Sequence, residues 1–179
     1  MPHVTDARLA RPNRETVLAG LRRSVIVVVT FVAVGALAGV VWEWLWEAPV
    51  GFAYEHKWLP DLAAARAEFS STGWYVLVAS VAGLLTAAIL GMAFDRWELL
   101  TLAVVLAGSA LAAWVMLRVG QALGPPDAQA VAATADDGTK IPANLTVAGK
   151  SPFVALPASA LVALIVVFFA FTRRHPKDD

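Results

Sequence analysis

Four long apolar runs dominate this sequence. They cover residues 24–41, 74–94, 99–117 and 153–171. A helix needs about 20 apolar residues to cross about 30 Å of hydrocarbon at 1.5 Å per residue. The 179-residue chain is 59% hydrophobic, above the roughly 45–50% of soluble domains. The runs therefore predict four membrane-spanning helices rather than a soluble core.

Lysine and arginine are distributed unevenly around these runs. Nine lie in the N-terminal segment 1–23, the turn 95–98 and the tail 173–179, against five in the loops 42–73 and 118–152. Cytoplasmic segments of membrane proteins carry the excess of Lys and Arg. We therefore expect a multi-pass protein of the plasma membrane with both termini cytoplasmic and both long loops outside. This topogenic role accounts for the N-terminal arginines without a nucleic-acid partner.

The turn between the second and third runs has four residues, which predicts that these two helices are antiparallel neighbours. The expected fold class is an all-α membrane protein, a four-transmembrane-helix up-down-up-down bundle with small extracytoplasmic β-hairpin elements. Residues 24–172 form its membrane domain. Arg22-Arg23 before the first run also allows a cleaved signal peptide, but the run continues into tryptophans without a polar cleavage region, which favours a true span.

The two long loops carry signals for local structure. In the first loop, residues 50–54 alternate as a short strand does, and a separate helix is expected over residues 62–69. In the second loop, residues 129–134 and 145–147 are expected to form a β-hairpin around the turn 136–139. The strand of the first loop is a candidate third strand for that hairpin.

Small residues recur every four positions along the runs. Close backbone approach at such stripes holds helices together in lipid. The helix-packing candidates are Gly35, Gly39, Gly83, Ala87 and Gly91. The Gly35/Gly39 face serves either packing within the bundle or homodimerisation, and we favour the bundle because three helices of the same chain compete for it.

Tryptophans cluster where the first run ends and the second begins. Trp42, Trp44, Trp46 and Trp74 are expected to form an aromatic belt at the headgroup level.

Two carboxylates lie among these tryptophans. Glu43 and Glu47 share one helical face if the first helix continues through Trp46. Such a pair is able to bind a cation or perform acid/base chemistry, but no nucleophile or further ligand accompanies it, which favours a solvated edge. Arg118 ends the third run at the same level, so an outer-face ion pair with Glu43 or Glu47 is a further hypothesis, with snorkelling to the headgroups as its alternative.

Residue types that are missing from the four apolar runs argue against several classes of function. Their central parts contain no ionisable residue, whereas proton-coupled transporters and pumps keep such groups at membrane depth. The chain has no cysteine, and its three histidines lie outside the runs, so thiol chemistry and haem ligation within the bundle have no candidates. We therefore expect no enzyme, no catalytic residue, no cofactor and no metal.

Three short segments resemble a family of small four-span actinobacterial membrane proteins of unknown function. They are Trp42-Glu43-Trp44-Leu45-Trp46-x-Ala48-Pro49-x-Gly51, residues 69–75, and Asp137-Gly138-Thr139 before Ser151-Pro152. The resemblance covers most of the chain. It implies a four-span topology and a plasma-membrane location, and it transfers no catalytic residue.

Two function hypotheses follow. The first is a non-enzymatic accessory or scaffold subunit of a cell-envelope complex, whose outer hairpins and small-residue helix faces contact another membrane protein or a second copy. The second is a small transport or lipid-handling protein that acts as a homo-oligomer. In both hypotheses the lipid bilayer is a partner.

Overall fold

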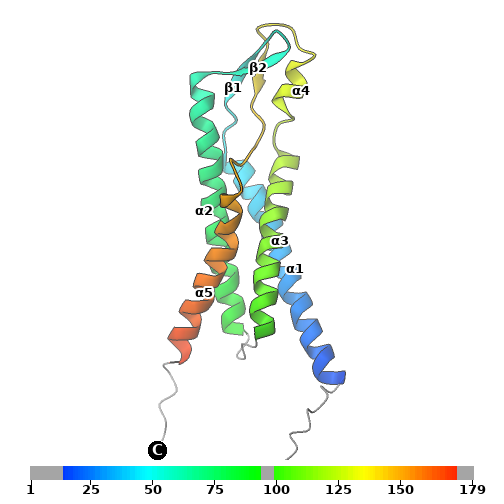
Figure 1. Cartoon of the computed structure of the whole chain (residues 1–179), viewed down its shortest axis with the longest axis vertical. Helices are drawn as coiled ribbons and strands as arrows, with labels where there is room; N and C mark the ends of the chain where they lie inside the picture. Colours follow the sequence, from blue (N-terminus) through cyan, green and yellow to red (C-terminus); the bar gives the residue numbers. More distant parts are fainter. Residues whose placement is uncertain (1–13, 94–98, 173–179) are drawn as a thin grey trace, which may run out of the picture.

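The computed structural model describes residues 14–93 and 99–172, and in this part of the chain four long helices form a bundle. Each helix is long and apolar enough to cross a membrane. Figure 1 shows them running along the long axis of the molecule. Their bounds are α1 (Arg14–Leu45), α2 (Leu62–Ala93), α3 (Leu99–Leu123) and α5 (Ala155–Thr172).

A small mixed unit, which we call the head, lies at one end of the bundle (Figure 1). It contains a three-stranded antiparallel sheet of order β2-β1-β3 and a short helix. The end of the bundle next to it is called the head end. The elements of the head are β1 (Val50–Tyr54), β2 (Lys57–Pro60), α4 (Ala128–Ala132) and β3 (Lys140–Pro142).

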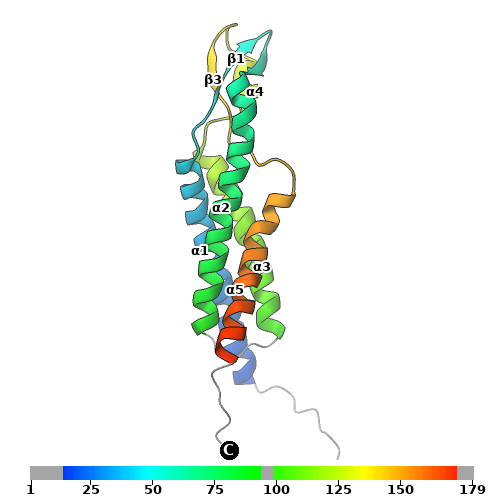
Figure 2. The ribbon, with the colours of Figure 1, turned by 90° about the vertical axis from the view of Figure 1, so that its left-hand side faces the viewer.

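The helices associate in two main pairs, α1 with α3 and α2 with α5. Figure 2 shows α2 and α5 side by side. The helices α2 and α3, which the short turn predicted to be neighbours, contact each other little. The expectation that these two helices pack closely was wrong, because the packing partner of each helix depends on which surfaces fit together and not on the length of the connection.

Glycines determine the α1–α3 pair. A Cβ atom added at Gly35 would lie 2.5 Å from the carbonyl oxygen of Ala112, and one at Gly39 would lie 2.6 Å from that of Met116. A Cβ atom added at Gly120 would likewise collide with the ring of Trp42. The residue numbers of the contacting positions increase together along α1 and α3, so these two helices run parallel. The Gly35/Gly39 face thus packs inside the bundle, as we favoured over a homodimer.

The second small-residue stripe lies between α2 and α5. A Cβ atom at Gly83 would collide with Ser159 Oγ and would lie 2.5 Å from the carbonyl oxygen of Leu156. Ala87 and Gly91 continue this stripe and are also buried. Close backbone approach at Gly83 excludes larger side chains.

The loops differ from their expected structure in three places. The helix expected at residues 62–69 continues without interruption into the second apolar run as α2. Residues 129–134, expected as a strand, lie mostly in α4, because Asp127 caps an alanine-rich segment with a strong helix preference. Residues 145–147 form no strand. The hairpin is instead β1–β2 in the first loop, and β3 joins β1 from the second loop.

The start of α5 resolves the role of Pro157. A 3-10 turn, η1 (Ser151–Val154), leads into α5 at Ala155, so Pro157 falls in the first helical turn. Proline is tolerated in the first turn of a helix. The expected basic segment up to residue 13, the turn 95–98 and the tail 173–179 lie outside the described residues.

We predict opposite effects for two glycine-to-alanine substitutions. Gly35→Ala forces a Cβ into the backbone of α3 and should lower the free energy of unfolding by about 1–3 kcal/mol. Gly73→Ala is the matched control, because nothing lies within 4 Å of its Cβ position in α2. It should raise that free energy by about 0.5–1 kcal/mol. Thermal unfolding in detergent measures both effects. If Gly35→Ala does not lower the midpoint temperature of unfolding, the close α1–α3 contact is contradicted.

Candidate functional site

The two faces of the head sheet differ sharply in their surroundings. One face packs on α4, where Ala53 and Ile141 are buried against Ala128 and Ala132. Trp58 covers part of this face and donates its indole N–H to the carbonyl oxygen of Ile141 at 3.1 Å. This arrangement gives the head a small core of its own.

Glycine at position 51 makes room for that tryptophan. A Cβ there would lie 2.5 Å from Trp58 Nε1 and 2.6 Å from the carbonyl oxygen of Leu59. Any larger residue would therefore displace the indole that links β2 to β3.

The turn between β1 and β2 has an unusual backbone. Glu55 and His56 have φ values of 48° and 60°, as a two-residue type I′ hairpin turn requires, although Asn and Gly are the residues that favour it. Contacts from the second loop hold the turn: Glu55 N–H donates to Asp137 Oδ1 at 2.8 Å, and His56 Nδ1 lies 3.1 Å from the carbonyl oxygen of Ala133. The two loops therefore stabilise each other's conformation.

The other face of the sheet is open and largely apolar. Val50, Phe52 and Tyr54 alternate with the buried residues of β1, and their exposed fractions are 45%, 40% and 54%. Leu59 lies opposite Phe52 and is 48% exposed. We call these four residues, together with Pro142 opposite Val50, the open face. Contiguous exposed apolar patches of this kind are typical of interaction sites.

Two lysines border the open face. Lys57 lies opposite Tyr54 on β2, and Lys140 lies opposite Phe52 on β3. Both edge strands are short and carry a proline, Pro60 or Pro142. Prolines and lysines on edge strands oppose the addition of a further strand. The chemistry of this sheet therefore favours contact through its face rather than its edge.

Hydrogen bonds connect the bundle to the loops that carry the head. Trp42, which is fully buried, donates its indole N–H to the carbonyl oxygen of Ser71 at 2.9 Å. The Ser71 hydroxyl in turn donates to the carbonyl oxygen of Thr146 at 2.7 Å. Tyr75 packs edge-on against the Trp42 and Phe153 rings and donates its hydroxyl to the carbonyl oxygen of Ala113 at 2.8 Å. We call this group the junction.

The four tryptophans expected in one aromatic belt do not share one environment. Trp42 is fully buried and Trp46 is 8% exposed, so both belong to the core. Trp44 and Trp74 are 79% and 36% exposed and remain on the surface. Trp42 is buried because Gly120 leaves space for its ring.

The expected pairing of Glu43, Glu47 and Arg118 is not formed within the described part of the chain. The helix α1 ends at Leu45, so Glu47 lies beyond it and does not continue the helical face of Glu43. Arg118 instead lies over the ring of Trp114, with its guanidinium carbon 5.4 Å from the ring centre. In this contact the ring face stabilises the cation.

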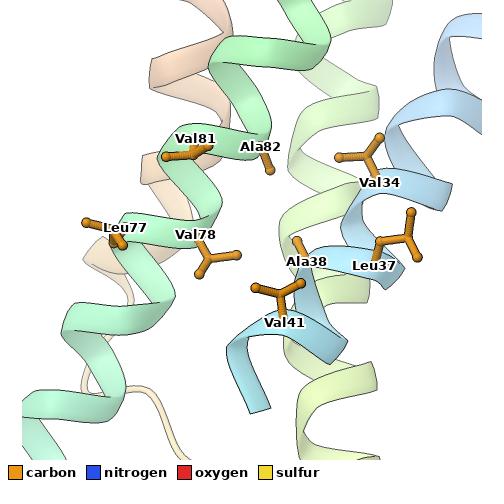
Figure 3. Close-up of a pocket in the computed structure, with 8 residues that line it drawn as sticks. All are labelled: Val34, Leu37, Ala38, Val41, Leu77, Val78, Val81 and Ala82. Atoms are coloured by element: carbon orange, nitrogen blue, oxygen red, sulfur yellow. The ribbon is translucent and has the colours of Figure 1, made fainter. Parts of the chain in front are cut away.

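An apolar groove lies between α1 and α2 and has a volume of about 320 Å³. Figure 3 shows Val78 and Ala82 of α2 pointing toward Val34 and Ala38 of α1. Only apolar atoms line it. Its remaining lining residues are Leu37, Val41, Leu77 and Val81.

Neither chemistry nor comparison assigns a catalytic centre. Among the described residues, no group of three or more His, Asp or Glu side chains is arranged to hold a metal ion. No family model, curated protein or solved structure matches the chain. The open face and the groove are therefore the candidate functional sites.

Sequence reasoning identified the strand 50–54 but missed the open face. The signal was present, because large side chains at positions 50, 52 and 54 alternate with Gly51 and Ala53. Alternation alone does not tell which face is buried, and here the small residues face the core because α4 and Trp58 need the space.

We predict that the junction, not the surface tryptophan, stabilises the fold. Trp42→Phe removes the hydrogen bond to Ser71 and leaves a cavity, so the free energy of unfolding should fall by about 2–3 kcal/mol. Trp44→Phe, four-fifths exposed in the same helix, is the matched control and should change it by less than about 0.5 kcal/mol. Thermal unfolding in detergent measures both, and equal effects would refute the role of the junction.

Proposed function

We propose that this protein is an integral membrane protein of the plasma membrane whose four long helices cross it up-down-up-down. The support is their surface chemistry: in the most apolar window of each helix only 22 to 39% of residues are buried. Exposed aliphatic helix faces are unfavourable in water and favourable in hydrocarbon. The excess of Lys and Arg in the termini supports an orientation with both termini in the cytoplasm.

Within this topology, we propose a non-enzymatic role as an accessory or scaffold subunit of a cell-envelope complex. The open face is the observation that carries this proposal. Its apolar centre and flanking lysines match a protein surface with an apolar patch bordered by carboxylates. Such a patch, desolvated at its centre and charged at its rim, has the usual composition of an interface.

Four hydroxyl groups of the spans support a scaffold over a transporter. Ser24 and Thr30 of α1 donate to the carbonyl oxygens of Gly20 and Ile26, at 3.0 and 2.8 Å. Ser109 and Ser159 likewise bond to carbonyl oxygens three residues earlier in their own helices. Hydroxyls that satisfy their own helix do not line a polar path.

Rigid attachment of the head also fits a docking role. Two hydrogen bonds connect the second loop to α2. The Ser71 hydroxyl donates to the carbonyl oxygen of Thr146, and Ala148 N–H donates to Thr72 Oγ1 at 3.0 Å. A surface that is ordered before binding loses less entropy when a partner docks.

Copurification tests the scaffold proposal. After crosslinking in cells and mild detergent extraction, we expect the wild-type chain to retain a partner protein at a fixed ratio. Phe52→Gln places a polar amide at the centre of the open face and should reduce retention at least tenfold, since central apolar anchors contribute about 2 kcal/mol or more. Leu123→Gln, a similarly exposed position at the end of α3, is the control and should retain the partner.

The result that contradicts the proposal is equally specific. If the wild-type protein is extracted alone, or if Phe52→Gln retains the partner as well as Leu123→Gln does, the open face is not the docking surface. A homo-oligomer without a partner would favour the second hypothesis, a small transport or lipid-handling protein. The groove between α1 and α2 is the feature that supports this alternative, and flux of a solute or lipid in liposomes of the purified chain tests it.

A further inference from the structure

The groove between α1 and α2 lies in the half of the bundle nearer to the head. It begins four residues before the end of α1 and extends from Val41 to Val34. At 1.5 Å per residue, this interval is about 10 Å long and lies about 6 to 16 Å from the end of the helix. If the bundle spans a membrane as proposed, the groove lies in the outer half of the hydrocarbon layer.

The floor and the rim of the groove have different exposure. Ala38 and Val78 on the floor are 5% and 9% exposed. The rim residues are much more accessible, at 43 to 66%. They are Leu37, Val41, Leu77 and Val81. The groove therefore opens sideways, onto the exposed aliphatic faces of α1 and α2, and not into the interior of the bundle.

The size and chemistry of the groove restrict what fills it. With no polar atom in its lining, it offers no hydrogen bond to water, and such spaces stay dry. Its wholly apolar lining, its length of about 10 Å and its volume of about 320 Å³ match a slender hydrocarbon chain.

Two tryptophans lie next to the head end of the groove. Trp74 is one helical turn before Leu77 and Val78 on the same face of α2, and Trp44 is one turn after Val41 on α1. Both are exposed, and within the described part of the chain neither indole N–H has a protein acceptor. Indoles in this position donate hydrogen bonds to headgroup and ester oxygens at the membrane interface.

We propose that this groove is a binding site for one acyl chain of an outer-leaflet phospholipid, with its headgroup beside Trp44 and Trp74. The lipid fills a lateral space that the helices leave open because α1 pairs mainly with α3, and α2 with α5. This proposal rests on the membrane placement proposed above. It does not depend on the docking role of the open face.

Native mass spectrometry of the detergent-solubilised full chain, titrated with dioleoyl phosphatidylethanolamine, tests this site. We expect one phospholipid per chain to remain bound to the wild-type protein. Ala82→Leu fills the groove and should reduce the bound fraction at least fivefold. Ala110→Leu, on an exposed position of α3, is the matched control and should keep the lipid.

A second pair of variants tests the same site if Ala82→Leu does not fold. Leu37→Trp changes only a rim residue that is 66% exposed and should cover the groove, again with at least a fivefold loss of bound lipid. Leu111→Trp, 42% exposed on α3, is its control. Circular dichroism identifies the variants that have folded.

Each outcome has one interpretation. Lipid retained equally by folded Ala82→Leu and Leu37→Trp, or no lipid bound by the wild-type chain, overturns the proposal. A dimer that carries no lipid and that Leu37→Trp dissociates would also overturn it, because a side chain of a second copy then fills the groove. Release of the chain from membranes without detergent would instead refute the membrane placement itself.

Discussion

Close contact between helix backbones at glycine is the constraint on which this structure depends. Gly35 and Gly39 bring α1 against α3, and Gly83 brings α2 against α5. At each point even a methyl group would collide with backbone of the neighbouring helix. Because apolar side chains gain little from leaving lipid for a protein interior, such contacts must supply the specificity of helix pairing in a membrane.

The same pairing explains both candidate functional sites. Two tight pairs leave a looser contact between α1 and α2, and there the lateral groove lies. At the head end, close approach of α1 to α3 puts the ring of Trp42 against Gly120, from where its indole reaches Ser71. The junction then holds the second loop, which supplies α4 and β3 to the head. The position of the open face thus follows from contacts inside the bundle.

The sequence predicted the helical content well and the tertiary arrangement partly. Four apolar runs correspond to four long helices because apolar length is a strong local signal. The turn at Asp137-Gly138 was also expected, since the turn preference of these residues is local. The continuous helix α2 was not, because Ser71 and Thr72 look like a helix stop in isolation. In the structure their hydroxyls bond to the distant second loop instead.

The burial of several residues near the candidate sites was predicted wrongly for one common reason. Trp42 and Trp44 are two positions apart in one helix, yet one is buried and the other is exposed. Tryptophan as a residue type indicates a membrane interface, but only the position of Gly120 decides which of the two rings is buried. Likewise, the strand 50–54 was recognised, but its exposed face depends on where α4 packs. Contacts between residues that are distant in the sequence leave no periodic pattern in it.

We propose that the bundle crosses a membrane and carries the head on its outer side. The chain contains no cysteine, so a single introduced cysteine reports topology without background. Asp136 lies exposed in the head region, and Glu15 lies exposed near the start of α1. With a membrane-impermeant maleimide, D136C should be labelled in intact cells and E15C only after permeabilisation. Labelling of E15C in intact cells, or protection of D136C until the cells are permeabilised, would contradict this topology.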